Sequence, residues 1–169
     1  APARAAGEAI IIPETRFSFE GLFGTYDRGA LQRGFQVYKE VCSACHAVRQ
    51  LSYRNLLEIG LTEAQARAIA AQFEVMDGPN DQGEMFERPA RLADRMRRPF
   101  ANEAAARAAN NGAYPPDLSV IVKARANGAD YLHALLTGYA DPPEGFGMMD
   151  GMNYNRYFPG CQISMPNVL

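Results

Sequence analysis

The chain has 169 residues, of which 47% are hydrophobic and 21% charged, and its formal net charge is −2. This length suits one domain with a sizeable core, and the composition is typical of a soluble globular protein. The slight acidic balance argues against nucleic acid as a partner, because binding a polyanion requires a basic surface. The longest uninterrupted aliphatic run, residues 10–12, is far shorter than a membrane-spanning helix requires, so we expect no transmembrane helix in these residues.

Periodic apolar residues predict an all-α fold with long loops. After an N-terminal arm of about residues 1–26, helices are predicted over residues 27–45, 62–73, 102–109 and 129–139. Thr62 and Gln65 form a capping-box pair at the second helix, and Asn110-Asn111-Gly112 ends the third. Strand patterns are nearly absent, and the glycine- and proline-rich chain after Tyr139 reads as irregular. We expect residues 1–169 to form a single domain.

Cys42-Ser43-Ala44-Cys45-His46 has the C-x-x-C-H pattern of covalent c-type haem attachment. Two thiols three positions apart near a helix end can each reach one haem vinyl group, and the adjacent imidazole can bind the iron. We therefore expect one covalently attached haem c, with Cys42 and Cys45 as attachment residues and His46 as an iron ligand.

A zinc site and a thioredoxin-like redox pair are the alternatives for this motif. Only Cys161 and His133 remain to complete a tetrahedral zinc site, which is too few ligands. A thioredoxin-like motif should follow a strand, whereas the segment before Cys42 reads as a helix. Haem attachment is therefore favoured, and Cys161 is left as a free buried thiol.

The second iron ligand is less clearly marked. The candidates are His133, Met76, Met85, Met96, Met148, Met149, Met152 and Met165. An outward-facing or hydrogen-bonded imidazole is the commoner state for a helical position such as that of His133. Pro166 and the turn at 158–160 stiffen the backbone around Met165, which slightly favours this residue, although an ordinary buried methionine would also fit.

An acidic stretch without basic residues covers positions 74–87, and five arginines follow it between 88 and 98. Such a stretch can steer a positively charged redox partner. A solvated loop balanced by the neighbouring arginines is the equal alternative.

Five blocks of the chain, together with the haem motif, resemble the cytochrome c1 family, the haem subunit of the cytochrome bc1 complex. These blocks, in order from about Phe17 onward, are residues 33–42, 77–80 with 83–86, 106–112 leading to 115–119, 130–131 with 135–139, and 157–160 ahead of Met165. Because all of them occur in sequence, the resemblance is far more specific than the haem motif alone. It implies a class I cytochrome c-like haem domain.

The resemblance also implies roles for single residues. Met165 matches the methionine ligand, and Arg125 matches an arginine near a haem propionate. Pro116 matches the proline whose carbonyl accepts a hydrogen bond from the proximal imidazole. The plain alternatives are a core methionine, a solvated charge and a rigid turn.

Three further residues match contacts of the haem in this family. Asn110 and Tyr38 resemble haem-edge contacts, and Tyr131 resembles an aromatic residue of the haem pocket. An ordinary helix cap explains Asn110 equally well, and core packing explains the two tyrosines.

The function implied by the resemblance is electron transfer. The haem would take one electron from a Rieske iron–sulfur protein and pass it to a soluble c-type cytochrome, within a complex that also contains cytochrome b. This subunit would make or break no bond itself. A haem sensor or peroxidase-like enzyme with an open sixth position, and a stand-alone soluble cytochrome, are the competing interpretations.

The resemblance further implies a location at the periplasmic face of the bacterial inner membrane, or alternatively at the intermembrane-space face of the mitochondrial inner membrane. In the family, the chain continues past the methionine ligand into a C-terminal helix and a membrane anchor. We therefore expect residues 1–169 to be a fragment that lacks both, and whose membrane association would depend on the missing anchor.

Overall fold

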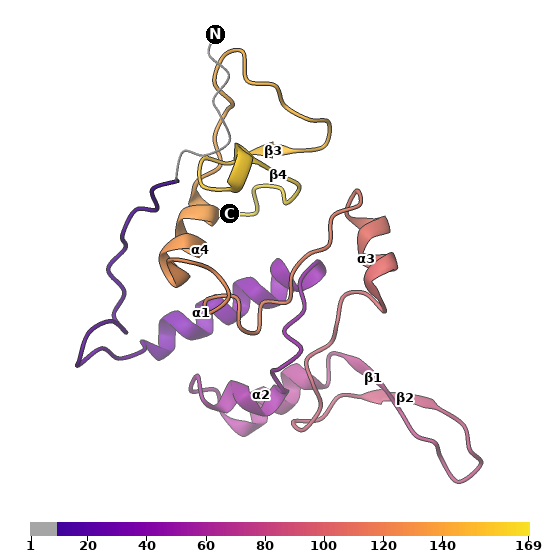
Figure 1. Ribbon diagram of the computed structural model, residues 1–169. Helices are drawn as coiled ribbons and strands as arrows, with labels where there is room; N and C mark the ends of the chain where they lie inside the picture. The colour runs from indigo at the N-terminus through magenta and orange to yellow at the C-terminus, as the bar shows by residue number, and fades with distance from the viewer. Residues whose placement is uncertain (1–9) are drawn as a thin grey trace.

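The computed structural model describes residues 10–169, which form a mostly helical structure with four very short strands (Figure 1). The elements, in chain order, are α1 (Arg28–Glu40), η1 (Cys42–Ala44), η2 (Tyr53–Leu57), α2 (Glu63–Ala70), β1 (Glu74–Asp77), β2 (Phe86–Pro89), α3 (Glu103–Ala109), α4 (Gly128–Thr137), β3 (Asn153–Tyr154), η3 (Pro159–Cys161) and β4 (Gln162–Ile163), where η marks a 3-10 helix. None of the described helices has both the length and the apolar character needed to cross a membrane.

The four predicted α-helices are confirmed, and side chains cap three of them. Asp27 accepts a hydrogen bond from the Ala30 amide at the start of α1, and Asn102 does the same for Ala105 at α3. Thr62 and Gln65 form the expected capping box at α2. The prediction that the first helix continues to Cys45 is wrong, because the chain tightens into η1 after Glu40.

The acidic stretch forms a hairpin, which the expectation of an all-α fold missed. β1 pairs with β2 in antiparallel fashion, with Glu74 opposite Pro89 and Asp77 opposite Phe86. Asn80 stabilises the turn by accepting hydrogen bonds from two backbone amides. In Figure 1 this hairpin projects away from the helices. Short, mostly exposed strands carry little apolar alternation, so periodicity does not predict them.

The main apolar core lies around η2 and α2. Its buried members are Val48, Tyr53, Leu56, Ala66, Ala70, Ala90 and Met96. α1 contributes only half-buried side chains to it, Phe35 and Tyr38, and has no fully buried residue. The apolar stripe of α1 is therefore only partly covered by the described residues.

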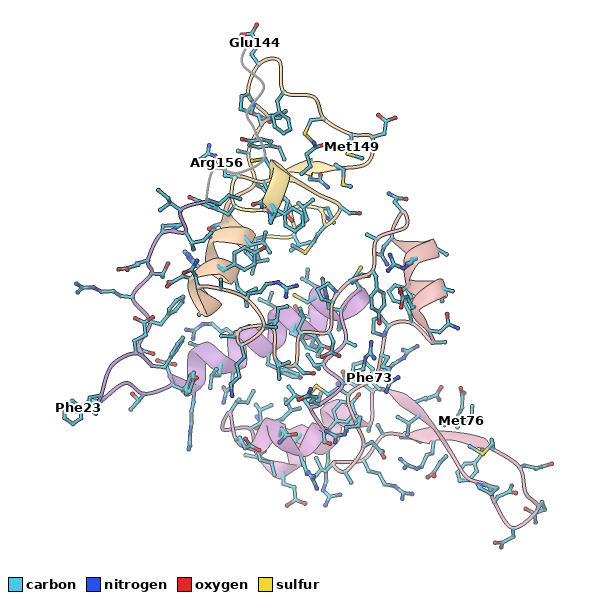
Figure 2. All side chains as sticks on the ribbon, in the orientation of Figure 1. Phe23, Phe73, Met76, Glu144, Met149 and Arg156 are labelled. Atoms are coloured by element: carbon cyan, nitrogen blue, oxygen red, sulfur yellow. The ribbon has the colours of Figure 1, made fainter. Side chains whose placement is uncertain are left out.

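The expected N-terminal arm lies partly outside the described residues, and its described part, residues 10–26, contains no helix or strand. The ring of Phe19 stacks on Phe17 and Tyr26, with centroids 5.1 and 4.9 Å apart. The Thr15 amide donates to the Asp130 carboxylate at 2.8 Å and so ties the arm to α4. Figure 2 shows Phe23 at the outer tip of this arm, where it is 91% exposed.

Candidate functional site

The two cysteines of the C-x-x-C-H motif and its histidine lie on one turn at the end of α1. The amides of Cys45 and His46 both donate to the Cys42 carbonyl, at 3.1 and 2.8 Å. Both thiols are free; Cys42 is half-buried and Cys45 is exposed. Burial raises the pKa of the Cys42 thiol, so this thiol is held in its neutral form at neutral pH.

The imidazole of His46 is held from a distant segment. Its Nδ1 lies 2.8 Å from the Pro116 carbonyl oxygen, which can only accept, so Nδ1 carries the proton and donates. This tautomer leaves the Nε2 lone pair available to a metal ion. The Tyr38 hydroxyl donates to the His46 carbonyl at 3.3 Å. Burial, together with the Asp117 charge, raises the pKa of Tyr38 to about 12, so the hydroxyl keeps its proton.

Residues 117–119 hold the chain that follows His46. The Leu118 amide donates to the Ala47 carbonyl at 2.8 Å, and the Arg49 amide donates to Asp117 at 2.9 Å. The Gln50 amide donates to the Ser119 hydroxyl at 3.0 Å. Sequence reasoning identified Pro116 but missed Asp117 and Ser119, because their partners lie 68 and 69 positions away along the chain.

Met165 is held through its backbone. Its carbonyl oxygen accepts hydrogen bonds from the Tyr139 hydroxyl at 2.9 Å and from the Asn153 amide group at 3.3 Å. Its side chain lies in the half-buried range, in the segment that follows β4. Neither partner can be predicted from the sequence, since a tyrosine near a helix end and an asparagine in a glycine-rich loop are both common.

Asn155 connects the Met165 segment to α4. It is completely buried, its amide group donates to the Leu135 carbonyl at 2.7 Å, and its side-chain oxygen accepts from the Tyr157 amide at 3.0 Å. Its own backbone amide donates to the Cys161 carbonyl at 3.0 Å. A buried amide with both ends satisfied fixes the segments that it joins, and sequence reasoning missed this residue.

The other candidate ligands lie in different environments. Met96 is buried in the main core. Met76, on the hairpin, and Met149, on the loop after α4, are 60 and 61% exposed and are labelled in Figure 2. His133 is exposed, and its Nδ1 lies 3.2 Å from the Thr15 hydroxyl. Within residues 10–169, no group of three or more His, Cys, Asp and Glu side chains converges as a metal site would require.

Three predicted residues stand apart from these contacts. Asn110 caps α3 by donating to the Ala106 carbonyl at 2.7 Å, and the exposed Arg125 donates to the Ala124 carbonyl at 3.1 Å. Tyr131 is half-buried on α4. In the described part of the chain, no hydrogen bond joins these three side chains to His46 or Met165.

A comparison with models of known protein families agrees with the order of the sequence blocks described above. The model of the Cytochrome C1 family matches residues 17–169. This chain belongs to the cytochrome c1 family.

Known members of the cytochrome c1 family are similar to this chain over nearly all its length. It is 52% identical over all of its residues to "Cytochrome c1 1, heme protein, mitochondrial" from Arabidopsis thaliana, covering 55% of that protein. Over 98% of its residues it is 49% identical to "Cytochrome b-c1 complex catalytic subunit, mitochondrial" from Candida albicans, covering 58% of that protein.

A bacterial protein, "Cytochrome b/c1" from Bradyrhizobium diazoefficiens, is 48% identical over 93% of the chain, which covers 26% of that longer protein. The chain thus spans about half the length of its mitochondrial cytochrome c1 relatives, and a smaller share of this one.

Proposed function

We propose that residues 1–169 form a single class I cytochrome c-like haem domain that transfers electrons within a bc1 complex. Cys42 and Cys45 would attach one haem c, and His46 and Met165 would bind its iron. The observation that carries this proposal is the donor set itself. Two free thiols share one turn with an imidazole whose Nδ1 is already engaged by Pro116.

The different exposures of the two thiols and the half-buried apolar faces of two helices suit a large apolar group. The thiols differ in exposure, Cys42 being half-buried and Cys45 exposed, so one edge of the group would be covered and one edge open. The apolar stripe of α1 and the apolar face of α4, including Tyr131, are half-buried in the described residues. When bound, haem supplies a one-electron iron couple whose potential depends on the axial ligands and their surroundings.

The chain's own residues would position this group and tune it. The hydrogen bond from His46 to the Pro116 carbonyl makes the imidazole a stronger donor and prevents it from rotating. The hydrogen bond from the Tyr38 hydroxyl to the His46 carbonyl fixes the backbone of His46. Arg125 uses one N–H group on the adjacent carbonyl, which leaves other N–H groups for a haem propionate. Asn110 and Tyr131 are proposed as further contacts by family resemblance alone.

The proposed partners follow from the family and from the names of the relatives. The Candida albicans relative is named as a subunit of the cytochrome b-c1 complex. We accordingly propose that the chain works beside cytochrome b, takes electrons from a Rieske iron–sulfur protein and passes them to a soluble c-type cytochrome. The proposed location is the periplasmic face of the bacterial inner membrane, with the intermembrane-space face of mitochondria as the alternative.

The acidic hairpin is proposed to steer the soluble cytochrome. Asp77 is paired with Arg88, which also binds Asp94. Glu74, Glu84 and Glu87 are exposed and form no ion pair within the described residues. Unpaired exposed charges contribute to a long-range field, whereas paired charges largely cancel.

The proposal is tested by mixing the reduced holo-protein with an oxidised, positively charged soluble c-type cytochrome in a stopped-flow instrument. We expect rapid electron transfer with a rate constant that falls as salt is added. The variant Glu84→Gln/Glu87→Gln should transfer electrons more slowly at low salt and equally fast at high salt. Absence of electron transfer from a correctly loaded protein would contradict the proposal.

A further inference from the structure

We infer that Asp117 is a positioning residue for His46, which sets the strength of the hydrogen bond between the imidazole and the Pro116 carbonyl. The inference rests on the proposed function, because it concerns the imidazole as an iron ligand. Pro116 and Asp117 share one peptide group, whose oxygen accepts the Nδ1 proton. The conformation of Asp117 therefore determines where that oxygen lies.

The carboxylate of Asp117 joins the loop after His46 to the segment that contains Pro116. One oxygen accepts a hydrogen bond at 2.9 Å from the amide of Arg49, which is three residues after His46. The other oxygen accepts one from the Ser119 amide at 2.9 Å. The side chain of Asp117 is 24% exposed, so these bonds are partly shielded from water. The loop after His46 and the peptide that receives its proton are thus held together by a single side chain.

Arg49 anchors this arrangement to α3. Its Nε lies 3.4 Å from Asp117, and its Nη2 donates to the Tyr114 hydroxyl at 2.7 Å. The guanidinium of Arg107, on α3, lies 5.5 Å from the centre of the Tyr114 ring, within the range of a cation–π contact. The position of Asp117 is therefore supported by the loop after His46 and, through Tyr114 and Arg107, by α3, so a shift of its carboxylate would disturb both.

A displaced Asp117 should weaken the hydrogen bond from His46. A weaker bond at Nδ1 leaves the imidazole a poorer donor, so ferric iron loses stabilisation and the reduction potential rises. Removing the negative charge would also raise the potential, so neutral variants cannot separate the two causes. Asp117→Glu separates them, because it keeps the charge but moves the carboxylate by one methylene group.

The test compares Asp117→Glu with Asp94→Glu in the holo-protein. Asp94 is a matched control: its side chain is 21% exposed, it accepts from the Arg91 amide at 2.7 Å, and it pairs with Arg88. For Asp117→Glu we expect the Nδ1 proton of His46 to exchange with solvent about tenfold faster by NMR, the change that weakening one ordinary hydrogen bond allows. We also expect the ferric-to-ferrous ratio at a fixed potential to change about threefold, or ~30 mV.

Each outcome decides the inference. Faster exchange and a higher potential in Asp117→Glu, with neither in Asp94→Glu, support it. Unchanged exchange and potential in Asp117→Glu overturn it, and equal changes in both variants show a general loosening that also overturns it. If Asp117→Glu does not retain haem, Ser119→Ala takes its place, since it removes the side-chain hydrogen bond of Ser119 to the Asp117 carboxylate along with the acceptor of the Gln50 amide. The same changes, smaller in size, are then expected, and their absence overturns the inference.

Failure of the inference can be distinguished from failure of the proposed function. If the wild-type chain, matured in a host that attaches c-type haem, carries no covalent haem, the proposed function fails and the inference fails with it. If wild-type loading is complete and only the Asp117→Glu result is negative, the proposed function stands.

Discussion

The two proposed iron ligands are held in different ways. The His46 side chain is itself hydrogen-bonded, and the loop after it is joined to residues 117–119 by three further hydrogen bonds. Within residues 10–169, the hydrogen bonds that hold Met165 come from Tyr139 and Asn153 and reach its carbonyl oxygen. The imidazole is therefore oriented directly by the protein, whereas the position of the methionine sulfur depends on the fold of the C-terminal segment.

The difference follows from the chemistry of the two side chains. An imidazole has a second nitrogen that can donate to a carbonyl, so its orientation can be fixed from behind. A thioether has no donor and is at most a weak acceptor, so packing and backbone must place it. Changes around His46 should alter how strongly its imidazole donates to the iron. Changes around Met165 should alter the fraction of molecules in which its sulfur is bound to the iron.

The largest effect is expected from the thiols on the His46 side. Cys42→Ala/Cys45→Ala should lose all covalently attached haem, because both proposed thioether bonds are removed. The measurement is the haem that stays with the polypeptide after extraction with acidified organic solvent. Cys161→Ala is the control and should keep its haem, since this half-buried cysteine lies on the Met165 side. Equal haem retention in both variants would contradict the proposed attachment.

The next effect is expected at Met165 itself. Met165→Leu should lose the sulfur ligand, and the reduction potential should fall by roughly 60 mV or more, a tenfold change in the ferric-to-ferrous ratio. Redox titration measures this fall. Met149→Leu is the matched control, because Met149 is 61% exposed, and its potential should equal that of the wild type. If the potential of Met149→Leu fell by the same amount, the fall would not be specific to Met165, and the assignment of Met165 as the iron ligand would be contradicted.

A smaller effect is expected from the support of the Met165 segment. Asn155→Ala should lower the free energy of unfolding by about 2–3 kcal/mol, because it leaves the Leu135 carbonyl and the Tyr157 amide without their partner. Denaturant unfolding measures this change. Asn167→Ala changes an exposed asparagine of the same segment and should stay within about 0.5 kcal/mol of the wild type. Equal effects of both variants would mean that Asn155 does not fix this segment.

The smallest effect is a pH dependence confined to the His46 side. Burial acts to raise the pKa of the Asp117 carboxyl, but hydrogen bonds from Ser119 and Arg49 outweigh it and hold the pKa below its ordinary value. A lowered pKa in the folded state gives stability that is present above the unfolded-state pKa of about 3.9 and is lost as the pH falls below it. Asp117→Asn should flatten the dependence of the unfolding free energy on pH between about 5 and 3.

Asn155→Ala, on the Met165 side, is the control for this pH dependence. Tyr139, Asn153 and Asn155 do not titrate in this acidic range, so Asn155→Ala should be less stable than the wild type but keep the same slope with pH. A wild-type slope in Asp117→Asn would show that this carboxylate contributes no pH-dependent stability.

Local features could be predicted from the sequence. The capping pair Thr62 and Gln65 marks a helix start within three residues, and the structure confirms it. The alanine-rich stretch 102–109 predicts a helix, which the structure also confirms. The C-x-x-C-H motif is equally local. The hairpin was missed, although the turn at residues 78–83 between two short runs is a hairpin signal. Its strands pair through their backbones and bury little apolar surface, so they carry no clear alternation of apolar and polar residues.

Contacts between distant segments could not be predicted in the same way. The bond between Asp117 and the Arg49 amide joins residues 68 positions apart, and that between Asn155 and the Leu135 carbonyl joins residues 20 positions apart. Neither an aspartate after two prolines nor an asparagine in a loop indicates which carbonyl or amide it will meet. Such pairings depend on how helices and loops are brought together, which no periodicity within one segment encodes.

The most direct test of the account is an optical spectrum of the oxidised and reduced wild-type protein, combined with the addition of carbon monoxide to the reduced form. With His46 and Met165 both bound to iron, the ferric protein should show the weak near-infrared band of a sulfur-to-iron bond, and carbon monoxide should bind slowly. If the band is absent and carbon monoxide binds at once, the sixth position is open. The six-coordinate electron carrier would then be contradicted, and a ligand-binding haem protein would take its place.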